Sequence, residues 1–382
     1  MMTINKNIGL YIHIPFCKRK CNYCDFYSLA CSDKRDFSEY VSAICAHMRR
    51  ESHLYTECIV DSVFFGGGTP SLLDPDDFKR ICDTVRECFA LAPSAELSLE
   101  ANPCTVTKKA LDVYKKCGIN RLSIGLQSSH GDELSTLGRL HSLADFERAF
   151  SLARDVGFDN ISVDIMYALP EQNLDKFIKT IDYVASFEPE HISSYCLKIE
   201  SGTPFAKMAL NLPDEDIQYE MYMKMCERLC ELGYEQYEIS NFAKNGHRCA
   251  HNLKYWLSME YVGFGPSAHS FFDGVRYSYE PSISEYCSAI SLGSVPKRIS
   301  EATLTPCAEE VRDEYVMLRM RLCDGVDFCE FKEQFGVDFD SVYNTEKYEK
   351  SGHIIRDNER VRFSSAGFFV SSFILSDILE HI

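Results

Sequence analysis

The chain is poor in tryptophan, in positive charge and in long apolar runs. It has one tryptophan in 382 residues, and its 40 Lys and Arg are outnumbered by 57 Asp and Glu, for a net charge of −17. Nucleic acids and anionic membranes select for clustered Lys and Arg, so this balance argues against both as partners. No run of about 18 apolar residues occurs that could span a bilayer.

The N-terminal segment also lacks the features of a secretion signal. Its apolar run is too short, and no small-residue cleavage site follows. Eighteen cysteines in such a chain indicate a reducing compartment, where thiols stay free or bind metal. We therefore expect a cytoplasmic protein. With 45% hydrophobic residues it can bury one large α/β core and still form a smaller second domain.

Short apolar runs alternate with longer helical patterns over the first 200 residues. Strands are predicted at 10–14, 62–65, 96–100, 121–125, 161–165 and 191–197, with helices between them at 37–51, 76–89, 107–117 and 143–156. Crossovers of this length join parallel strands. The strands read as apolar on both faces, as expected where helices cover a parallel sheet. The prediction is an α/β fold, a barrel or partial barrel of six βα units.

Polar residues and glycines follow the predicted strands at the points where they end. In such folds the carboxyl ends of the strands build the site. These residues are Cys17, Cys21 and Cys24 after the first strand, 66–71 after the second, Glu100, Gln127 and Asp164 at the next three, and Arg139 and His141 after the fourth. We expect a bound polar cofactor at this rim.

The three cysteines, spaced CxxxCxxC in one loop, carry the sharpest chemical signal. They can hold three corners of a cubane cluster and leave one iron without a protein ligand. Structural zinc is the alternative, although it usually takes four Cys or His in two separated pairs, and the near neighbours here are His13 and Asp25. A second alternative is that the cysteines bind no metal.

With Tyr23 directly before the third cysteine, this loop resembles the radical S-adenosylmethionine (SAM) superfamily. The resemblance implies a [4Fe-4S] cluster on Cys17, Cys21 and Cys24, whose free iron chelates the amino and carboxylate groups of SAM. It also implies that reduction of the cluster yields a 5′-deoxyadenosyl radical. The segment GGGTPS at 66–71 is similar to the stretch of that superfamily that meets the methionine amino group.

Five longer motifs resemble the oxygen-independent coproporphyrinogen III oxidase family, from about residue 9 to about residue 270. They are YIHIPFC at 11–17, FFGGGTPS at 64–71, RLSIGLQS at 121–128, LGRLH at 137–141 and DIMYALP at 164–170. By position, the resemblance implies a SAM site at Tyr11, Tyr23, Gly67, Gly68, Thr69, Glu100, Gln127, Arg139 and Asp164.

The residue types suit that assignment. Arg139 can hold a carboxylate through two parallel hydrogen bonds. Glu100 and Asp164 can accept hydrogen bonds from ribose hydroxyls. The alternative is that Arg139 and Glu100 simply pair across the rim as a structural contact.

Two departures separate this sequence from the true oxidases. The oxidases carry a further cysteine two residues after the third, where Phe26 stands here, and a long N-terminal extension, whereas sixteen residues precede Cys17. Both features resemble the HemW-type heme chaperones instead. Resemblance to that branch implies that the protein binds heme and delivers it to acceptors such as respiratory membrane enzymes. The protein could act as a monomer or as a homodimer. The alternative function is oxidative decarboxylation of a porphyrinogen propionate.

A second segment supports the chaperone branch. Residues His251, Asn252, Tyr255 and Trp256 lie in HNLKYW, which resembles the heme-binding HNxxYW segment of that branch. Imidazole is a good axial ligand, and aromatic rings pack on a porphyrin face. Cys249 and His269 are competing ligands, and a buried structural histidine is the alternative. We expect His251 near the open side of the barrel.

After about residue 305 the βα pattern gives way to a helix rich in charged residues. We therefore divide the chain into a core domain, 1–300, and a C-terminal domain, 305–382. Three helices are predicted, the first at 309–322, a short second one that follows Gly325 and ends at 335, and a third near 341–350. A hairpin of 354–356 with 361–363 and an apolar helix at 366–379 follow. This arrangement resembles a winged helix. Because it shows no basic stripe, we predict a covering role, with the last helix docked on the barrel.

Overall fold

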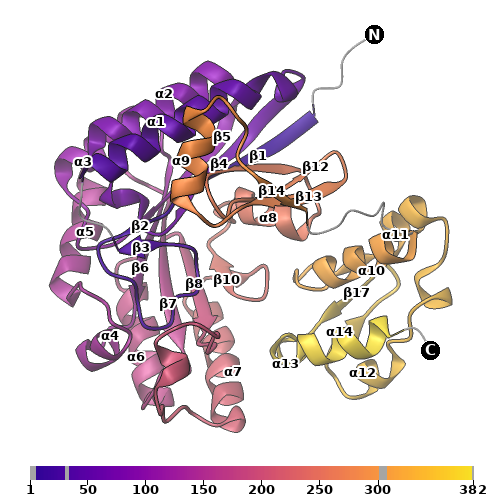
Figure 1. Cartoon of the computed structure of the whole chain (residues 1–382). Coiled ribbons are helices and arrows are strands. Elements are labelled where there is room, and N and C mark those ends of the chain that lie inside the picture. Colours follow the sequence, from indigo (N-terminus) through magenta and orange to yellow (C-terminus); the bar gives the residue numbers. More distant parts are fainter. Residues whose placement is uncertain (1–5, 31–33, 301–307, 381–382) are drawn as a thin grey trace.

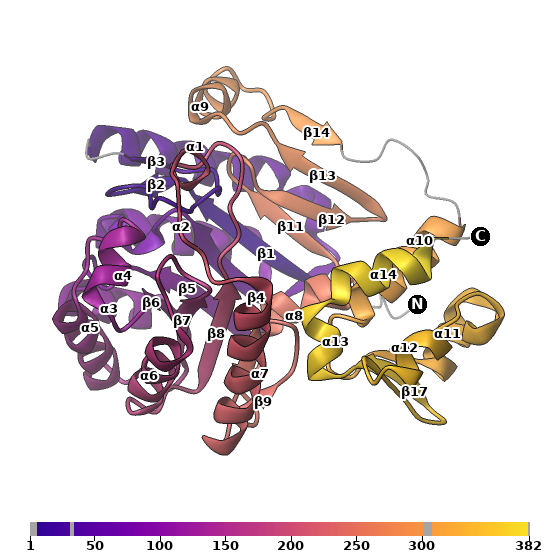
Figure 2. The ribbon, with the colours of Figure 1, turned by 90° about the horizontal axis from the view of Figure 1, so that it is seen from below.

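The computed structural model describes residues 6–30, 34–300 and 308–380. A mixed sheet of twelve strands, in the order β14-β13-β12-β11-β1-β4-β5-β6-β7-β8-β10-β9, forms the centre of the molecule. Helices follow the outer side of its parallel part, and the C-terminal region lies to one side next to α8 (Figure 1; Figure 2). None of the helices in the described ranges has the length and apolar character needed to cross a membrane.

The six predicted strands are confirmed, and together they form the curved parallel part of the sheet. They are β1 (Lys6–Ile14), β4 (Cys58–Gly67), β5 (Ala90–Ala101), β6 (Arg121–Gln127), β7 (Ile161–Tyr167) and β8 (His191–Cys196), each parallel to the next. The four predicted helices are also confirmed, as α1 (Lys34–Glu51), α2 (Pro75–Cys88), α3 (Lys108–Lys116) and α5 (Leu143–Asp155). The remaining crossovers contain α4 (Gly131–Thr136) and α6 (Leu174–Ala185).

Beyond the six units, the sheet continues at both edges in a way that the sequence did not predict. β11 (Tyr261–Phe264) pairs in parallel with β1, and β12 (His269–Phe272), β13 (Val275–Tyr279) and β14 (Arg298–Ser300) follow antiparallel. β10 (Asn241–Ala243) and β9 (Glu235–Gln236) extend the other edge. The helices of this part are α7 (Glu215–Glu231), α8 (Ala250–Trp256) and α9 (Ile283–Ser291). A short separate pair, β2 (Phe16–Cys17) and β3 (Leu29–Ala30), flanks the cysteine loop.

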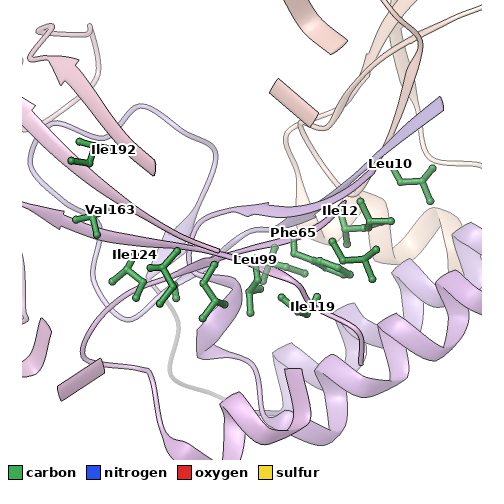
Figure 3. Packing of buried hydrophobic residues seen from close by; sticks show 14 of the residues in the cluster. Leu10, Ile12, Phe65, Leu99, Ile119, Ile124, Val163 and Ile192 are labelled. Carbon is green, nitrogen blue, oxygen red and sulfur yellow. The ribbon is translucent and has the colours of Figure 1, made fainter. Parts of the chain in front are cut away.

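The outward face of the parallel strands is the main hydrophobic core. Figure 3 shows its side chains between the sheet and the helices, with Leu10, Ile12, Phe65, Leu99, Ile119, Ile124, Val163 and Ile192 labelled. The register places the strand residues among them in cross-strand rows, such as Ile124 opposite Val163 and Val163 opposite Ile192. Each is almost completely buried, which contributes about 1.5–3 kcal/mol per large aliphatic side chain.

The inward face is polar, so the prediction that the strands are apolar on both faces is wrong. The alternate residues Ser62, Glu96, Ser162 and His191 point into the barrel in matching register. Nδ1 of His191 hydrogen-bonds the Ser162 hydroxyl at 2.8 Å, and its Nε2 hydrogen-bonds the Tyr237 hydroxyl at 2.9 Å. A partial barrel has no second apolar layer inside, and buried polar groups are stable there once they are hydrogen-bonded.

The C-terminal region has its own sheet, in the order β15-β17-β16, and five helices in the described residues. The strands are β15 (Val326–Asp327), β16 (Ile354–Arg356) and β17 (Arg360–Phe363), and the helices are α10 (Ala308–Arg319), α11 (Phe328–Phe335), α12 (Glu346–Lys350), α13 (Ser365–Phe369) and α14 (Ser371–Leu379). The predicted hairpin is confirmed. The predicted helix 366–379 is two helices that meet at Val370, and only its last part matches α14.

The C-terminal region docks on the barrel through α13, whose Phe369 ring contacts Tyr219 of α7 at 5.3 Å in an edge-on arrangement. Arg276 of β13 also pairs with Glu314 of α10 at 2.7 Å. Both contacts show that the region packs against the rest of the chain, and the covering role expected from the sequence stays a prediction. The predicted domain boundary falls at 301–307, outside the described residues, so the division of the chain into 1–300 and 305–382 stays a prediction.

Candidate cofactor cavity

A cavity of about 420 Å³ opens at the carboxyl ends of the parallel strands. It brings together most of the site residues expected from the sequence. The predicted residues that line it are Cys17, Cys21, Tyr23, Cys24, Gly67, Gly68, Thr69, Glu100, Gln127, Arg139 and Asp164. These come from the cysteine loop, from the ends of β4, β5, β6 and β7, and from the segment after α4, so strands far apart in sequence form one site.

The three thiols at the mouth of the cavity are free and polarised by neighbouring donors. The Thr69 hydroxyl donates a hydrogen bond to Sγ of Cys17, and Nη1 of Arg139 donates one to Sγ of Cys21, each at 3.6 Å. The pKa of the Cys24 thiol is raised to about 11, chiefly by burial, with smaller contributions from the nearby Cys21 and Cys17. Three adjoining thiolates would repel one another unless positive iron lay between them, so this donor set fits a cluster.

A cubane binds each cysteine to a different iron atom, which spaces the sulfurs more widely than ligands on one ion. Among the described residues, no group of three or more His, Cys, Asp or Glu side chains could hold a single metal ion.

The glycine segment after β4 is shaped by close contacts that exclude a side chain. Gly67 has φ of +112°, and a Cβ there would lie 2.6 Å from the ring of His13. A Cβ on Gly68 would lie 2.6 Å from the carbonyl oxygen of Phe16. The glycines therefore let the end of β4 pass directly against the start of the cysteine loop.

Two carboxylates from neighbouring strands face the cavity. Oε2 of Glu100 accepts a hydrogen bond from the Gly67 N–H at 3.1 Å, and Asp164 accepts from the Ser123 hydroxyl at 3.0 and 3.1 Å. Burial raises the pKa of Glu100 to about 8, and the charge of Asp164 adds to the rise. Burial likewise raises the pKa of Asp164. These carboxyl groups suit hydrogen bonds to ribose hydroxyls.

Arg139 is held at the same edge with unused hydrogen-bonding capacity. Its Nη2 donates to the carbonyl oxygen of Gly125 and its Nη1 to Cys21, while its buried Nε has no hydrogen-bond partner. In the described part of the chain, Arg139 bonds Cys21 and Gly125 while Glu100 bonds the Gly67 N–H, and the two form no ion pair with each other. The side chain thus keeps a donor for an anionic group such as a carboxylate.

The other predicted site residues lie elsewhere. Tyr11 is inside the barrel below the cavity, where its hydroxyl contacts Nδ1 of His13 at 3.1 Å and its ring stacks on Phe64. His251 is 1% exposed on α8, and its ring lies inside the barrel midway along β4, where it bonds Ser62 and stacks on Phe64. Asn252, Tyr255 and Trp256 are partly buried on the same helix. Heme binding by this segment therefore stays a prediction.

Sequence reasoning missed several residues that line the cavity, among them Phe26, Ser123, Met166 and Tyr195. Ser123 and Met166 could have been found, because they alternate with outward-facing residues on strands that had been predicted. Tyr195 lies near the end of the sixth predicted strand. The site residues predicted from the sequence come from the first five strands and the segments that follow them. Gln127 has φ of +74°, an unusual backbone conformation for a residue with a side chain. Such strain often marks a site, but no sequence pattern predicts it.

The barrel, with three cysteines at the carboxyl ends of its strands, defines the class as a radical SAM fold. Residues 11–184 match the Radical SAM superfamily, and residues 308–370 match the HemN C-terminal domain. Among solved structures, coproporphyrinogen III oxidase (HemN) from Escherichia coli, described as a radical SAM enzyme, superimposes with a TM-score of 0.85. That likeness covers 97% of this chain and 90% of the oxidase at 20% identity, so it shows the fold.

The curated relatives show the family. The heme chaperone HemW of Bacillus subtilis is 35% identical over 340 residues, which cover 87% of this chain and 88% of the relative. The heme chaperone HemW of Escherichia coli is 38% identical over 262 residues, 69% of each chain. The chain therefore belongs to the HemW family of the radical SAM superfamily. Membership of this superfamily implies a [4Fe-4S] cluster and SAM.

Proposed function

We propose that the protein is a heme chaperone, which binds heme, carries a SAM-liganded [4Fe-4S] cluster and delivers heme to acceptor proteins. The observation that carries this proposal is the 35% identity to a heme chaperone HemW over 87% of the chain. Respiratory hemoproteins are the acceptors we propose, with the handover in the cytoplasm. On sequence grounds we keep 1–300 as the core domain and 305–382 as the C-terminal domain.

We propose a role for each of these residue types in the cavity. Cys17, Cys21 and Cys24 would hold the cluster, which supplies an open iron site and a one-electron donor when it is bound. The unpartnered Nε of Arg139 would bind the SAM carboxylate. Glu100 and Asp164 would accept hydrogen bonds from the ribose, and the glycines at 67 and 68 would let the ligand approach the backbone.

Oxidation of coproporphyrinogen III is the second candidate, because the fold matches that oxidase over 97% of the chain. Phe26 argues against it. The family resemblance places a cysteine of the oxidases at this position, and Phe26 is 66% exposed at the mouth of the cavity. An exposed phenyl ring lacks both the thiol and the acid–base chemistry of that cysteine.

The deciding experiment is anaerobic reconstitution of the cluster, followed by a heme titration and a turnover assay on coproporphyrinogen III with SAM and a reductant. We expect about four irons per chain, saturable heme binding and no decarboxylated product. A triple variant, C17A/C21A/C24A, should lose the iron and serves as the control for cluster-dependent signals. Turnover in the wild type, or no specific heme binding, would overturn the proposal.

A further inference from the structure

We propose that Arg121 is a positioning residue of the SAM site. Its buried positive charge, below the cofactor cavity, stabilises the negative charge of Asp164, the carboxylate that would accept hydrogen bonds from the ribose. This inference rests on the proposed function, because it concerns how the chain prepares that SAM site. Arg121 is not among the residues that line the cavity, so it would act through Asp164 without touching the ligand.

Arg121 begins β6 and faces the interior of the barrel. Its neighbour Leu122 belongs to the outer hydrophobic core. Because successive side chains of a strand point to opposite faces, Arg121 shares the inward face with Ser123, which lines the cavity. In the sheet, Arg121 lies opposite Ser98 of β5, and Ser123 lies opposite Glu100. Arg121 is therefore one layer of inward residues below the floor of the cavity.

This cation is buried without a direct partner. Arg121 is 2% exposed, and its Nε has no hydrogen-bond partner. Across the described residues, its guanidinium forms no hydrogen bond and no ion pair. A charge taken out of water is costly unless other groups compensate it. The compensation comes from carboxylates that act on Arg121 without direct contact.

Two carboxylates in the barrel act on this charge from below and above. Burial lowers the pKa of Arg121, but the groups around it raise it above its usual value, in the order Cys249, Glu96, Tyr237 and Asp164. Cys249 and Tyr237 are neutral, because burial raises the pKa of the Cys249 thiol to about 12 and that of Tyr237 above its usual value. Glu96 and Asp164 are therefore the negative charges that compensate Arg121.

Glu96 is already committed to another part of the fold. Its carboxylate accepts hydrogen bonds from the backbone N–H groups of Ala250 and His251, at 2.9 and 3.2 Å, and so caps α8. It also accepts a hydrogen bond from the Ser98 hydroxyl at 3.2 Å. These bonds hold Glu96 without help from Arg121. The role of the cation therefore lies on its other side, toward the cavity.

Asp164 is the carboxylate on the cavity side. It accepts hydrogen bonds from the Ser123 hydroxyl at 3.0 and 3.1 Å. Burial raises the pKa of Asp164, and four groups oppose the rise, namely the hydroxyls of Ser193 and Ser123 and the charges of Arg121 and Arg139. Arg139 lies at the rim, where it would bind the SAM carboxylate, so the ligand uses its charge. Arg121 keeps its charge for Asp164.

Glu100, the second carboxyl group in the cavity, takes the opposite state. Its pKa is raised to about 8, chiefly by burial and next by the charge of Asp164, while Arg121 acts against the rise. Glu100 is therefore largely protonated at neutral pH. Asp164 is the member of the pair that we propose to carry the negative charge.

The histidines and tyrosines around this interior are neutral near pH 7. Burial lowers the pKa of His191 well below its usual value and that of His251 to about 3. Burial also raises the pKa values of Tyr11, Tyr195 and Tyr255 above their usual range. None of these groups supplies a positive charge that could replace that of Arg121.

The lack of direct contact suits this role. Charges are poorly screened in a protein interior, so Arg121 can stabilise the Asp164 carboxylate from a distance. It does so without occupying the lone pairs of that carboxylate. Serine hydroxyls orient the carboxylate, and its remaining lone pairs stay available for the hydroxyls of a ribose.

The test measures SAM binding to the reconstituted full chain by anaerobic equilibrium dialysis, from about pH 5 to 8.5. Wild-type affinity should fall as the pH falls and Asp164 takes up a proton. In R121M we expect the midpoint of that fall to move up by at least about 0.5 pH unit, which weakens binding about threefold below the midpoint. R121K keeps the charge and should keep the wild-type midpoint. R148M is the matched control, because Arg148 is exposed on α5 and pairs with Asp145.

A double-mutant comparison shows whether Arg121 acts through Asp164. In a D164N background, where no carboxylate can ionise at this position, R121M should leave the pH midpoint of SAM binding unchanged. R121Q is a second neutral variant, and urea denaturation checks that each variant folds. A wild-type midpoint in folded R121M or R121Q, or a shift that persists with D164N, would overturn the proposal. Failure of both neutral variants to fold would assign the charge to the stability of the barrel and would also overturn it.

Failure of the proposed function gives a different result. A wild-type chain that carries the cluster and binds no SAM at any pH would overturn the SAM site itself. Binding of SAM by the wild type, together with an unchanged midpoint in R121M, would overturn the role of Arg121 alone.

Discussion

The backbone N–H of Gly67 donates a hydrogen bond to Oε2 of Glu100 at 3.1 Å, which links the ends of β4 and β5 inside the cofactor cavity. The link depends on a backbone conformation with φ of +112° and on the close approach of His13 to Gly67. A carboxylate is thereby held by a main-chain donor in a place where a side chain at 67 cannot fit.

We expect Gly67→Ala to destabilise the apo-protein by at least about 1–2 kcal/mol, the usual cost of a left-handed backbone for a residue with a Cβ. The clash with His13 adds to that cost. Urea denaturation measures the change. Gly131→Ala is the matched control, because its Cβ would meet nothing within 4 Å and it lies in α4. Equal stability of both variants would show that position 67 tolerates a side chain.

The raised pKa of Glu100 predicts a pH dependence of stability. The carboxyl ionises at about 8 in the folded chain and near its usual 4.5 in the unfolded chain, so rising pH favours unfolding between these values. The slope is at most about 1.4 kcal/mol per pH unit. Glu100→Gln should therefore gain stability over the wild type as the pH rises from 5 to about 8.

Urea denaturation of both proteins at pH 5, 6.5 and 8 tests this expectation. Glu87→Gln provides the comparison, because Glu87 is exposed and its pKa is lowered by the hydrogen bond from Arg49. That variant should gain no stability at higher pH. A constant difference between Glu100→Gln and the wild type across the range would contradict the expectation.

The hydrogen bond from Thr69 to Cys17 predicts an effect on the reconstituted cluster. Hydrogen bonds to the sulfurs stabilise the reduced, more negative form and raise the reduction potential. Thr69→Val should make the potential more negative, which a redox titration monitored by electron paramagnetic resonance can measure. Thr136→Val is the control, since the Thr136 hydroxyl donates to the Asp132 carbonyl within α4. A potential unchanged by Thr69→Val would exclude this role.

The contact between α13 and α7 predicts how the C-terminal region is attached. Phe369 packs edge-on against Tyr219 at 5.3 Å and lies 6.0 Å from Tyr222. Phe369→Ala should cost about 1–3 kcal/mol, less than a fully buried phenylalanine, and should speed limited proteolysis of the C-terminal region. Phe373, 67% exposed on α14, gives the matched control. Equal proteolysis of the two variants would place the attachment elsewhere.

Local sequence patterns determined much of the fold. The six long parallel strands and the first helices follow from runs of apolar residues at strand or helix period, which each segment carries by itself. The positions of Cys17, Glu100 and Asp164 at strand ends also follow, because the carboxyl ends of parallel strands share one edge. The clustering of these residues around one cavity agrees with that argument.

Only the tertiary structure decided what lies inside the barrel. Whether Ser162 or His191 faces a helix or a polar interior depends on how far the sheet closes, and no single strand encodes that. The short strands β11 to β14 carry too few residues for a periodic signal, yet they extend the sheet beyond β1. The burial of His251 depends on Glu96, Ser62 and Tyr255, which come together only when α8 enters the barrel.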